Sequence, residues 1–305
     1  MEPDNKQRKP LSWRRRILWT AATLLLALLV AEVALRTLGS VVMRRQLASG
    51  SAEGAFTILC VGDSWTQGAP YGRYPDFLEQ RLEAERPGLD VRIVNVGSAG
   101  TNSSQALRRM ADAMAEAEPD LIVAMTGNND HHNLTASSYW RFQDRELGSW
   151  DVAAAGLRSS LHASRVYRLV RATWQKGRGA ATTNEFFARE EEQRHRDLIA
   201  IDRETHRKQL RYNLIKIVEL ARNHETPIVF QTYFHFHGYH VNEVIRDTAA
   251  RHDVPLADHN YVFHTDVPPE ERPALRIEDG HPNRDGYALM AETLAATLRQ
   301  ARLVP

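Results

Sequence analysis

Residues Phe56–Gly68 read FTILCVGDSWTQG, an apolar run that ends in Gly-Asp-Ser-Trp-Thr. The apolar letters predict a buried strand over Thr57–Val61, and the polar letters after it predict a turn into a helix. Ser64 is therefore expected where a strand of a parallel sheet ends and a helix begins, which makes it a candidate nucleophile. The same letters also describe a turn followed by an ordinary helix N-cap, so the assignment depends on the rest of the chain.

Three further polar segments follow apolar runs or precede the last predicted helix. They are Asn95-Val96-Gly97, Gly127-Asn128-Asn129-Asp130 and Asp279-Gly280-His281-Pro282-Asn283. In this order and context, the four segments resemble the SGNH (GDSL-type) hydrolase family. The serine elbow of the α/β-hydrolases, G-x-S-x-G, is not met, because Thr66 stands where its second glycine belongs.

Carried over position by position, the resemblance implies that Ser64 is the nucleophile and His281 the base. It also implies an oxyanion hole made of the backbone N–H groups of Ser64 and Gly97 and the side chain of Asn129. Acyl transfer needs these groups, because a neutral imidazole must take the serine proton and preorganised donors must bind the oxyanion. No cofactor and no metal ion are expected.

The carboxylate that orients His281 is not settled by the sequence. The family normally has an aspartate three residues before the histidine, and this chain has Glu278 there, followed by Asp279. A spacing of three brings two side chains to one side of a single turn, whereas Asp279 would point elsewhere in a regular turn. We therefore favour Glu278, with Asp279 as the alternative.

The alternation of strands and helices predicts the fold class. Apolar runs predict strands at Thr57–Val61, Val91–Val96, Leu121–Met125, Ile228–Tyr233 and Pro255–Ala257. Helical patterns lie between or after them at Tyr74–Arg86, Ser103–Glu118, Glu185–Asn223, Val241–His252 and Asp285–Leu303. This order predicts a flavodoxin-like α/β/α fold of three layers with a parallel sheet of about five strands. Ligands bind such sheets beyond the carboxyl ends of the strands, where the candidate residues are expected.

The connection from Asp130 to Ile228 is far longer than a crossover requires, so we predict a helical insertion at about 135–222. It is either a pair of surface helices or a lid over the cleft. Candidate substrate contacts are Trp65, His131, His235 and His237. The last two form an H-x-H-x-x-H pattern with His240, a spacing that zinc could use, but no carboxylate or cysteine cluster accompanies it.

Two further carboxylates could suggest a paired-carboxylate glycosidase. These are Asp63, beside the candidate nucleophile, and Asp130, beside Asn129. The family resemblance instead implies that both hold loop backbones through Asx-type hydrogen bonds.

The N-terminal region predicts membrane attachment. Residues 1–16 are a basic tail, 17–38 an apolar signal anchor of about 22 residues, or roughly 33 Å of helix, 39–54 a linker, and 55–303 the hydrolase-like domain. No A-x-A pattern follows the apolar run, which favours a retained transmembrane anchor over a cleaved signal. The excess of basic residues before the run predicts a cytoplasmic N-terminus and a catalytic domain on the periplasmic side of the inner membrane.

Composition limits the remaining possibilities. The 305 residues are 43% hydrophobic and 25% charged, enough for one well-buried domain with an insertion. The formal net charge is +1 and no basic face recurs, so a nucleic-acid partner gains no support. A single cysteine, Cys60, lies in the first predicted strand, which excludes an internal disulfide.

The sequence thus predicts a membrane-anchored serine esterase that splits O-acyl esters through an acyl-enzyme. The expected substrate is an ester-bearing glycan, lipid or small molecule. Acyl transfer to envelope glycans would use the same residues, and a catalytically silent binding or assembly protein would keep the same fold. These alternatives stay open.

Overall fold

The structure is a computed structural model that describes residues 12–48, 54–68, 72–131, 134, 137–142, 149–161, 164–167, 169–170, 173, 203–234 and 240–305. Its centre is a parallel five-stranded sheet with the strand order β2-β1-β3-β4-β5. The strands are β1 (Phe56–Gly62), β2 (Val91–Asn95), β3 (Leu121–Met125), β4 (Ile228–Gln231) and β5 (Leu256–Ala257). The predicted flavodoxin-like sheet is therefore confirmed.

The central strands are buried on both faces, because helices cover the sheet on both sides. All residues of β3 and the last six of β1 are buried, which explains why their sequences are continuous apolar runs. The fourth strand ends at Gln231 rather than at the predicted Tyr233. The reason is that the Tyr233 N–H donates to the side chain of Asn242, at 2.9 Å, instead of to a neighbouring strand.

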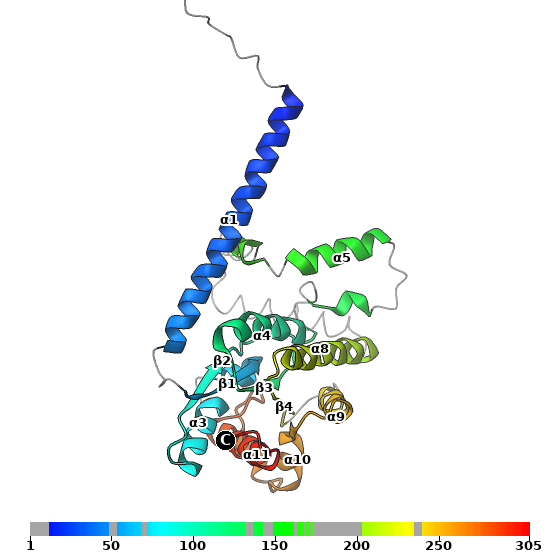
Figure 1. Ribbon diagram of the computed structural model, residues 1–305. Coiled ribbons are helices and arrows are strands. Elements are labelled where there is room, and N and C mark those ends of the chain that lie inside the picture. Colours follow the sequence, from blue (N-terminus) through cyan, green and yellow to red (C-terminus); the bar gives the residue numbers. More distant parts are fainter. Residues whose placement is uncertain are drawn as a thin grey trace, which may run out of the picture.

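Four predicted helices, Tyr74–Arg86, Ser103–Glu118, Val241–His252 and Asp285–Leu303, are present with ends within three residues of the expected ones, whereas the segments His259–Thr265 and Arg272–Leu275 have no predicted counterpart. The helices and short 3₁₀ segments are α1 (Trp13–Ala48), α2 (Ser64–Gln67), α3 (Tyr74–Glu85), α4 (Ser103–Ala117), η2 (Tyr139–Arg141), α5 (Ser149–Leu161), α8 (Arg203–Asn223), α9 (Val241–Arg251), α10 (His259–Thr265), η3 (Arg272–Leu275) and α11 (Arg284–Gln300). Helix α3 packs with α11 on one side of the sheet, and α4 packs with α8 and α8 with α9 on the other (Figure 1).

Helix caps place two of these helices next to the candidate site. Asn102 and Gln105 form a capping box at the start of α4, in which each side chain accepts from the other residue's backbone N–H. The Asn283 side chain accepts the Gly286 N–H at 3.0 Å and so begins α11. His281 lies just ahead of this cap, and its position is therefore tied to the last helix.

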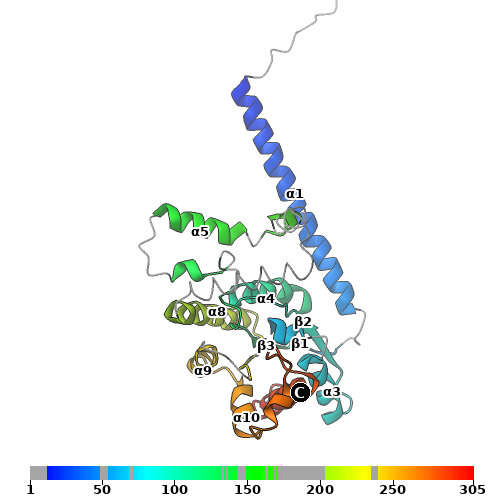
Figure 2. The same cartoon turned by 180° about the vertical axis from the view of Figure 1, so that it is seen from behind.

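Helix α1 stands apart from the sheet and projects beyond the domain (Figures 1 and 2). Its Trp13–Val41 portion has the length and composition of a membrane span: the most apolar stretch of 18 residues within it has a mean hydropathy of 2.2 and is not buried by the domain. A signal sequence would pass the same test. The helix continues to Ala48, so residues 39–48, which were predicted as a linker, are helical. These residues contain no proline, and Gly39 is the one glycine among them.

The predicted insertion at about 135–222 contains η2, α5 and most of α8. Residues 174–202 of the insertion lie outside the described ranges. The apolar residues predicted at helical spacing lie on the buried side of α8. They include Leu210, Leu214, Ile217 and Val218. This part of the insertion is thus a core helix of the domain.

Candidate active site

The hydroxyl of Ser64 and the imidazole of His281 form the centre of the site. Ser64 Oγ lies 2.7 Å from His281 Nε2, although the two residues are 217 positions apart in the chain. Ser64 is the first residue of α2, directly beyond the carboxyl end of β1, and His281 precedes α11. Both side chains are half-buried and remain accessible to solvent. The predicted pairing of these two residues is present in the structure.

Asp279, not Glu278, contacts the other nitrogen of the imidazole. Its Oδ1 lies 3.0 Å from His281 Nδ1 and also accepts the His281 backbone N–H at 3.0 Å. Our preference for Glu278 is therefore wrong in this geometry. Asp279 is largely exposed, with a side-chain accessibility of 62%, so water weakens the effect of its charge on the imidazole.

The reason for this correction is that the segment forms a hairpin rather than a helical turn. Ile277 N–H donates to the carbonyl of His281, and Gly280 N–H donates to the carbonyl of Ile277. Gly280 has φ +88°, the left-handed conformation that closes such three-residue hairpin loops. The i to i+3 spacing argument for Glu278 does not apply in this geometry. The Asp-Gly dipeptide was the sequence signal that could have indicated it.

Asp63 is fully buried next to Ser64 and caps α2. Its Oδ1 accepts the Trp65 N–H at 3.0 Å, and its Oδ2 accepts the Tyr233 hydroxyl at 2.7 Å. Burial raises the pKa of Asp63 to about 6, against the opposing effects of these two hydrogen bonds and of His281. The predicted Asx-type role of Asp63 is confirmed. Its hydrogen bond from Tyr233 could not be read from the sequence, because the two residues are 170 positions apart.

Trp65 is buried, with 3% of its surface exposed, and its ring packs against His281 with a centroid distance of 5.7 Å. The same ring makes edge contacts with Tyr233 and Phe234, at 5.3 and 6.1 Å. The prediction of a substrate contact at Trp65 is therefore wrong: the indole lies within the core and supports the imidazole. The sequence does not show on which side of α2 the side chain of Trp65 lies.

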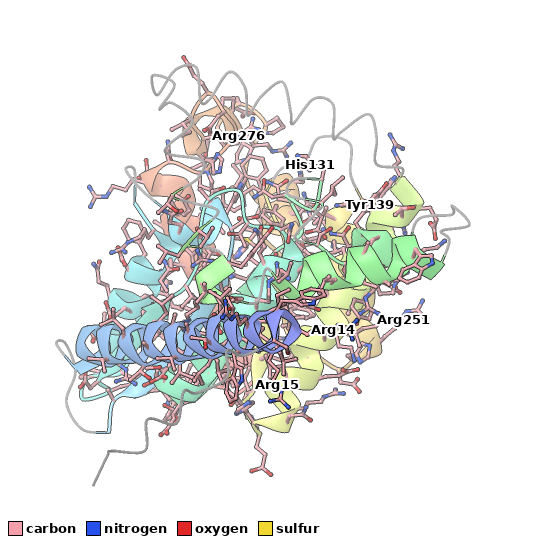
Figure 3. All side chains as sticks on the ribbon, turned by 90° about the horizontal axis from the view of Figure 1, so that it is seen from above. Arg14, Arg15, His131, Tyr139, Arg251 and Arg276 are labelled. Atoms are coloured by element: carbon pink, nitrogen blue, oxygen red, sulfur yellow. The ribbon has the colours of Figure 1, made fainter. Side chains whose placement is uncertain are left out.

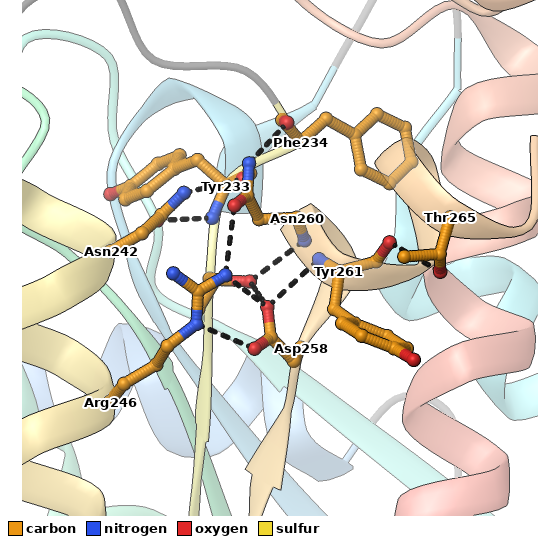
Figure 4. Close-up of polar contacts among 9 residues, drawn as sticks. Tyr233, Phe234, Asn242, Arg246, Asp258, Asn260, Tyr261 and Thr265 are labelled. Atoms are coloured by element: carbon orange, nitrogen blue, oxygen red, sulfur yellow. Dashed lines mark hydrogen bonds and ion pairs between the residues drawn. The ribbon is translucent and has the colours of Figure 1, made fainter.

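A polar network holds the loop that carries these aromatic residues (Figure 4). Asn242 accepts from the backbone N–H of Tyr233 and donates to its carbonyl, both at 2.9 Å. Asn260 donates to the carbonyl of Phe234 at 2.8 Å, and Arg246 binds both oxygens of Asp258 at 2.6 and 2.9 Å. Tyr233 and Phe234, directly after β4, are thereby held against Trp65.

The Asn129 side chain is the clearest candidate for an oxyanion donor. It follows β3 and is 5% exposed, yet its Nδ2 has no hydrogen-bond partner. A buried donor without a hydrogen-bond partner lowers the stability of the fold by about 1–3 kcal/mol. An unpaired donor of this kind is therefore expected where a ligand can accept its hydrogen bond. As the first residue of α2, Ser64 also presents a backbone N–H without a partner inside the helix.

The backbone N–H of Gly97, the third predicted donor, is already engaged. It donates to Asn95 Oδ1 at 2.9 Å, while Asn95 Nδ2 donates to the carbonyl of Thr66 at 2.7 Å. Gly97 is in close contact with α2, since a Cβ at this position would lie 2.5 Å from the Gln67 nitrogen. Gly97 thus lies beside α2 as expected, but in this conformation its N–H is not an open donor.

Asp130 joins the Asn129 loop to α4 and α8. Its two carboxylate oxygens accept the backbone N–H and the hydroxyl of Ser103, each at 2.5 Å. Asn213 donates to the hydroxyls of Ser103 and Ser104 at 2.7 and 2.9 Å. Burial raises the pKa of Asp130 to about 7, and the nearby Asp63 adds to this shift. Asp130 thus holds a backbone N–H, as predicted, but it is that of Ser103, 27 positions away, and the bond is not the local Asx-type bond that the resemblance implied.

The remaining predicted histidines have separate outcomes. His131 is buried, with 7% exposure, and Figure 3 shows it on the side of the molecule away from α1. His235 and His237 lie outside the described residues. His240 starts α9 and contacts Glu243, with 2.9 Å between Nδ1 and Oε1. Within the described ranges, no group of three or more His, Cys, Asp or Glu side chains is arranged to hold a metal ion.

The geometry is suited to nucleophilic acyl transfer. The half-buried hydroxyl of Ser64 is hydrogen-bonded to an imidazole whose far nitrogen faces the carboxylate of Asp279, which is the order of nucleophile, base and orienting group. The unpaired amide of Asn129 comes from the end of a strand adjacent to β1. Sequence reasoning missed the supporting residues Tyr233 and Asn95, because each acts through a contact that only the fold creates.

Comparison with known proteins adds evidence for the family. The sequence profile of the GDSL-like Lipase/Acylhydrolase family matches residues 60–289, which is most of the chain. A search of curated proteins found no match.

Several solved structures align with most of this chain. The structure titled "Crystal Structure of TesA" is 20% identical, with a TM-score of 0.47 over 80% of this chain and 98% of that one. A lipase/acylhydrolase from Enterococcus faecalis is 16% identical, with a TM-score of 0.48 over 80% and 96%. An acetyl-xylooligosaccharide esterase from Geobacillus is 18% identical, with a TM-score of 0.45 over 81% and 95%. On the match over residues 60–289, the chain belongs to the GDSL-like lipase/acylhydrolase family, and the SGNH resemblance is confirmed.

Proposed function

We propose that this protein is a membrane-anchored serine esterase that hydrolyses O-acyl esters through an acyl-enzyme. The single observation that carries the proposal is the 2.7 Å contact between Ser64 Oγ and His281 Nε2, with Asp279 on the opposite side of the imidazole. The family described as lipases and acylhydrolases supports an ester as the bond that is split. The expected substrates are ester-bearing glycans, lipids or small molecules.

In the first step, Ser64 Oγ attacks the ester carbonyl carbon while His281 Nε2 takes its proton. The carbonyl oxygen becomes an oxyanion, which the Ser64 N–H and the Asn129 amide would bind. The Gly97 N–H would join them through a bond shared with Asn95. The C–O bond to the alcohol then breaks, and His281 gives its proton to the leaving alkoxide, so that an acyl-enzyme remains on Ser64.

In the second step, His281 takes a proton from water, whose oxygen attacks the acyl carbon. The Ser64 Oγ–acyl bond breaks, the proton returns to Ser64, and the acid is released. A sugar hydroxyl in place of this water would give an acyltransferase with the same residues. Steady-state release of free acid, measured with and without a glycan acceptor that carries free hydroxyl groups, separates hydrolysis from transfer, because transfer to the acceptor lowers the amount of free acid.

Asn129 gives the sharpest test of this mechanism. Its amide should bind charge that exists mainly in the transition state, so Asn129→Ala should lower kcat on a p-nitrophenyl ester by roughly 10²- to 10³-fold with little change in KM. Asn128→Ala, one position earlier, is the matched control and should stay near the parent. An effect confined to KM would mean that Asn129 binds only the ground state.

Membrane anchoring is the second part of the proposal, and α1 supports it by its length and composition. Basic residues before Ile17 favour a cytoplasmic N-terminus and a periplasmic catalytic domain. The full-length protein should stay with inner membranes after a high-salt wash, and a phosphatase reporter fused after Pro305 should be active. A shortened, soluble product would instead indicate a cleaved signal.

A further inference from the structure

Helix α5 exposes an apolar stripe that the domain does not cover. Trp150, Leu157 and Leu161 are 86%, 64% and 39% exposed, and Ala153 and Ala154 between them are exposed as well. These positions follow helical spacing, so they lie along one side of α5. A different side of α5 faces the domain. Gly156 lies on that side next to the ring of Trp140, since a Cβ atom added at Gly156 would be 3.9 Å from the ring.

The exposed apolar surface continues after α5. Leu169 and Val170 are 51% and 58% exposed. We call α5 together with residues 164–167 and 169–170 the arm. Large apolar side chains exposed over consecutive segments indicate a surface that binds an apolar partner.

The arm is hydrogen-bonded to α1 through Glu32. The Glu32 carboxylate accepts the Ser164 hydroxyl at 2.8 Å and the backbone N–H groups of Arg165 and Val166 at 3.1 and 3.0 Å. Arg165 also donates to the carbonyls of Leu35 and Arg36, at 3.0 and 3.2 Å. The arm therefore meets α1 at one defined level.

That level lies near the outer end of the predicted span 17–38, six residues before its last residue. Between Arg16 and Arg36, α1 has 19 helical positions with Glu32 as the one charged residue, roughly 28 Å, close to the ~30 Å thickness of a hydrocarbon core. Glu32 lies one turn before Arg36 and is paired with it at 2.8 Å. Figures 1 and 2 show α5 running sideways from this part of α1, above α4 and α8. An in-plane helix at the outer interface would have this arrangement.

The amino-acid sequence of α5 and of the residues after it is basic. The sequence from Trp150 to Arg178 has one acidic residue, Asp151, and these basic ones: Arg158, Arg165, Arg168, Arg171, Lys176 and Arg178. Exposed Trp and Leu together with an excess of Lys and Arg are typical of segments that lie on anionic lipid.

We propose that the arm lies in the outer interface of the bilayer that α1 spans and holds the catalytic domain against that surface. The inference rests on the proposed membrane anchor. A lipid surface is favoured over a second protein copy, because the stripe lies at the level where α1 leaves the membrane and the segment is basic. Glu32 is then the positioning residue that fixes the level of the arm.

Nitroxide labels on the full-length protein test this assignment in vesicles of phosphatidylcholine and phosphatidylglycerol. Leu157→Cys reports on α5, Leu25→Cys on the predicted span, and Tyr261→Cys, 61% exposed on α10, on water. The native Cys60 is fully buried, so the unmodified chain gives the background. The measurement is relaxation of each label by oxygen, which concentrates in lipid, relative to a water-soluble nickel chelate.

We expect the oxygen-to-nickel ratio at Leu157 to exceed that at Tyr261 severalfold and to stay below that at Leu25. Adding Glu32→Ala should lower the ratio at Leu157 but leave that at Leu25 unchanged. A ratio at Leu157 equal to that at Tyr261, with a high ratio at Leu25, would overturn the interface assignment and leave the anchor standing.

Two other results would also overturn it. Shielding of Leu157 from both relaxants would mean that a protein surface, such as a second copy, covers α5. A ratio at Leu25 equal to that at Tyr261 would refute the anchor itself, and the inference would fail with it. Hydrolysis of a soluble ester by each labelled variant verifies that the catalytic domain is folded.

Discussion

Asp279 and Glu278 are neighbours in the hairpin that carries His281, and Asp279 makes the contact with the imidazole. The contact lies at an exposed position, so its contribution should be smaller than that of a buried triad carboxylate. Asp279 nevertheless fixes the orientation of the ring, because one oxygen bonds both the backbone N–H and Nδ1 of His281. At the scale of single residues, this pair decides how the base is held.

We expect Asp279→Asn to lower kcat by about ten- to a hundredfold, because the imidazolium formed as Ser64 gives up its proton loses its anionic partner. Glu278→Gln is the matched control and should stay within about twofold of the parent. Both values come from initial rates on a soluble p-nitrophenyl ester. If Glu278→Gln lowered kcat and Asp279→Asn did not, the contact between Asp279 and His281 would be contradicted, but the role of Ser64 would not.

At the scale of elements, the close approach of the end of β2 to α2 positions Ser64. Gly97, just beyond β2, lies so near α2 that an added Cβ would be 2.5 Å from the Gln67 nitrogen and 2.8 Å from Thr66 atoms. These neighbours include backbone, which cannot rotate away. A side chain at Gly97 would therefore displace the short helix that begins with Ser64.

Gly97→Ala should accordingly lower kcat by at least tenfold while the protein stays folded. Ser98→Ala changes the next residue without adding atoms and serves as the control. Circular dichroism and ester hydrolysis measured on the same samples separate a shifted helix from an unfolded protein. Parental turnover in Gly97→Ala would show that α2 tolerates the displacement.

The sequence indicated the elements well and their contacts less well. Strand β3 has its predicted bounds, Leu121–Met125. A strand that is buried on both faces consists of apolar residues alone, so its ends are visible in the sequence. Ser64 and His281 were also expected together, through the family resemblance. The prediction for Trp65, by contrast, was wrong. A helix of four residues is too short to show a periodic pattern of apolar residues, so the sequence does not indicate which side of α2 is buried. The Asp279 contact depended on a hairpin that the spacing argument ignored.

At the scale of the whole molecule, two buried carboxylates should make stability depend on pH. Burial raises the pKa of Asp63 to about 6 and that of Asp130 to about 7, whereas an unfolded aspartate titrates near 3.9. Between these values the folded state binds more protons than the unfolded state. The stabilisation is therefore fully present below about pH 4 and is lost as the pH rises toward 7.

Asp130→Asn should remove part of this dependence, since an amide keeps an acceptor for Ser103 but does not ionise. The difference between the thermal midpoints at about pH 5 and about pH 8 should be smaller in the variant than in the parent. Asp266→Asn, at an exposed position, is the control and should leave the difference unchanged. An unchanged difference in Asp130→Asn would mean that Asp130 is ionised in the folded protein across this range.

The central claim is that Ser64 is the nucleophile, and labelling with a fluorophosphonate tests it most directly. The reagent forms a covalent bond with an activated serine, so the parent should gain one adduct, located on Ser64 by peptide mass spectrometry. Ser98→Ala should label like the parent, and Ser64→Ala should not label at all. Labelling of Ser64→Ala at the parental rate, or an adduct on another residue of the parent, would contradict the account.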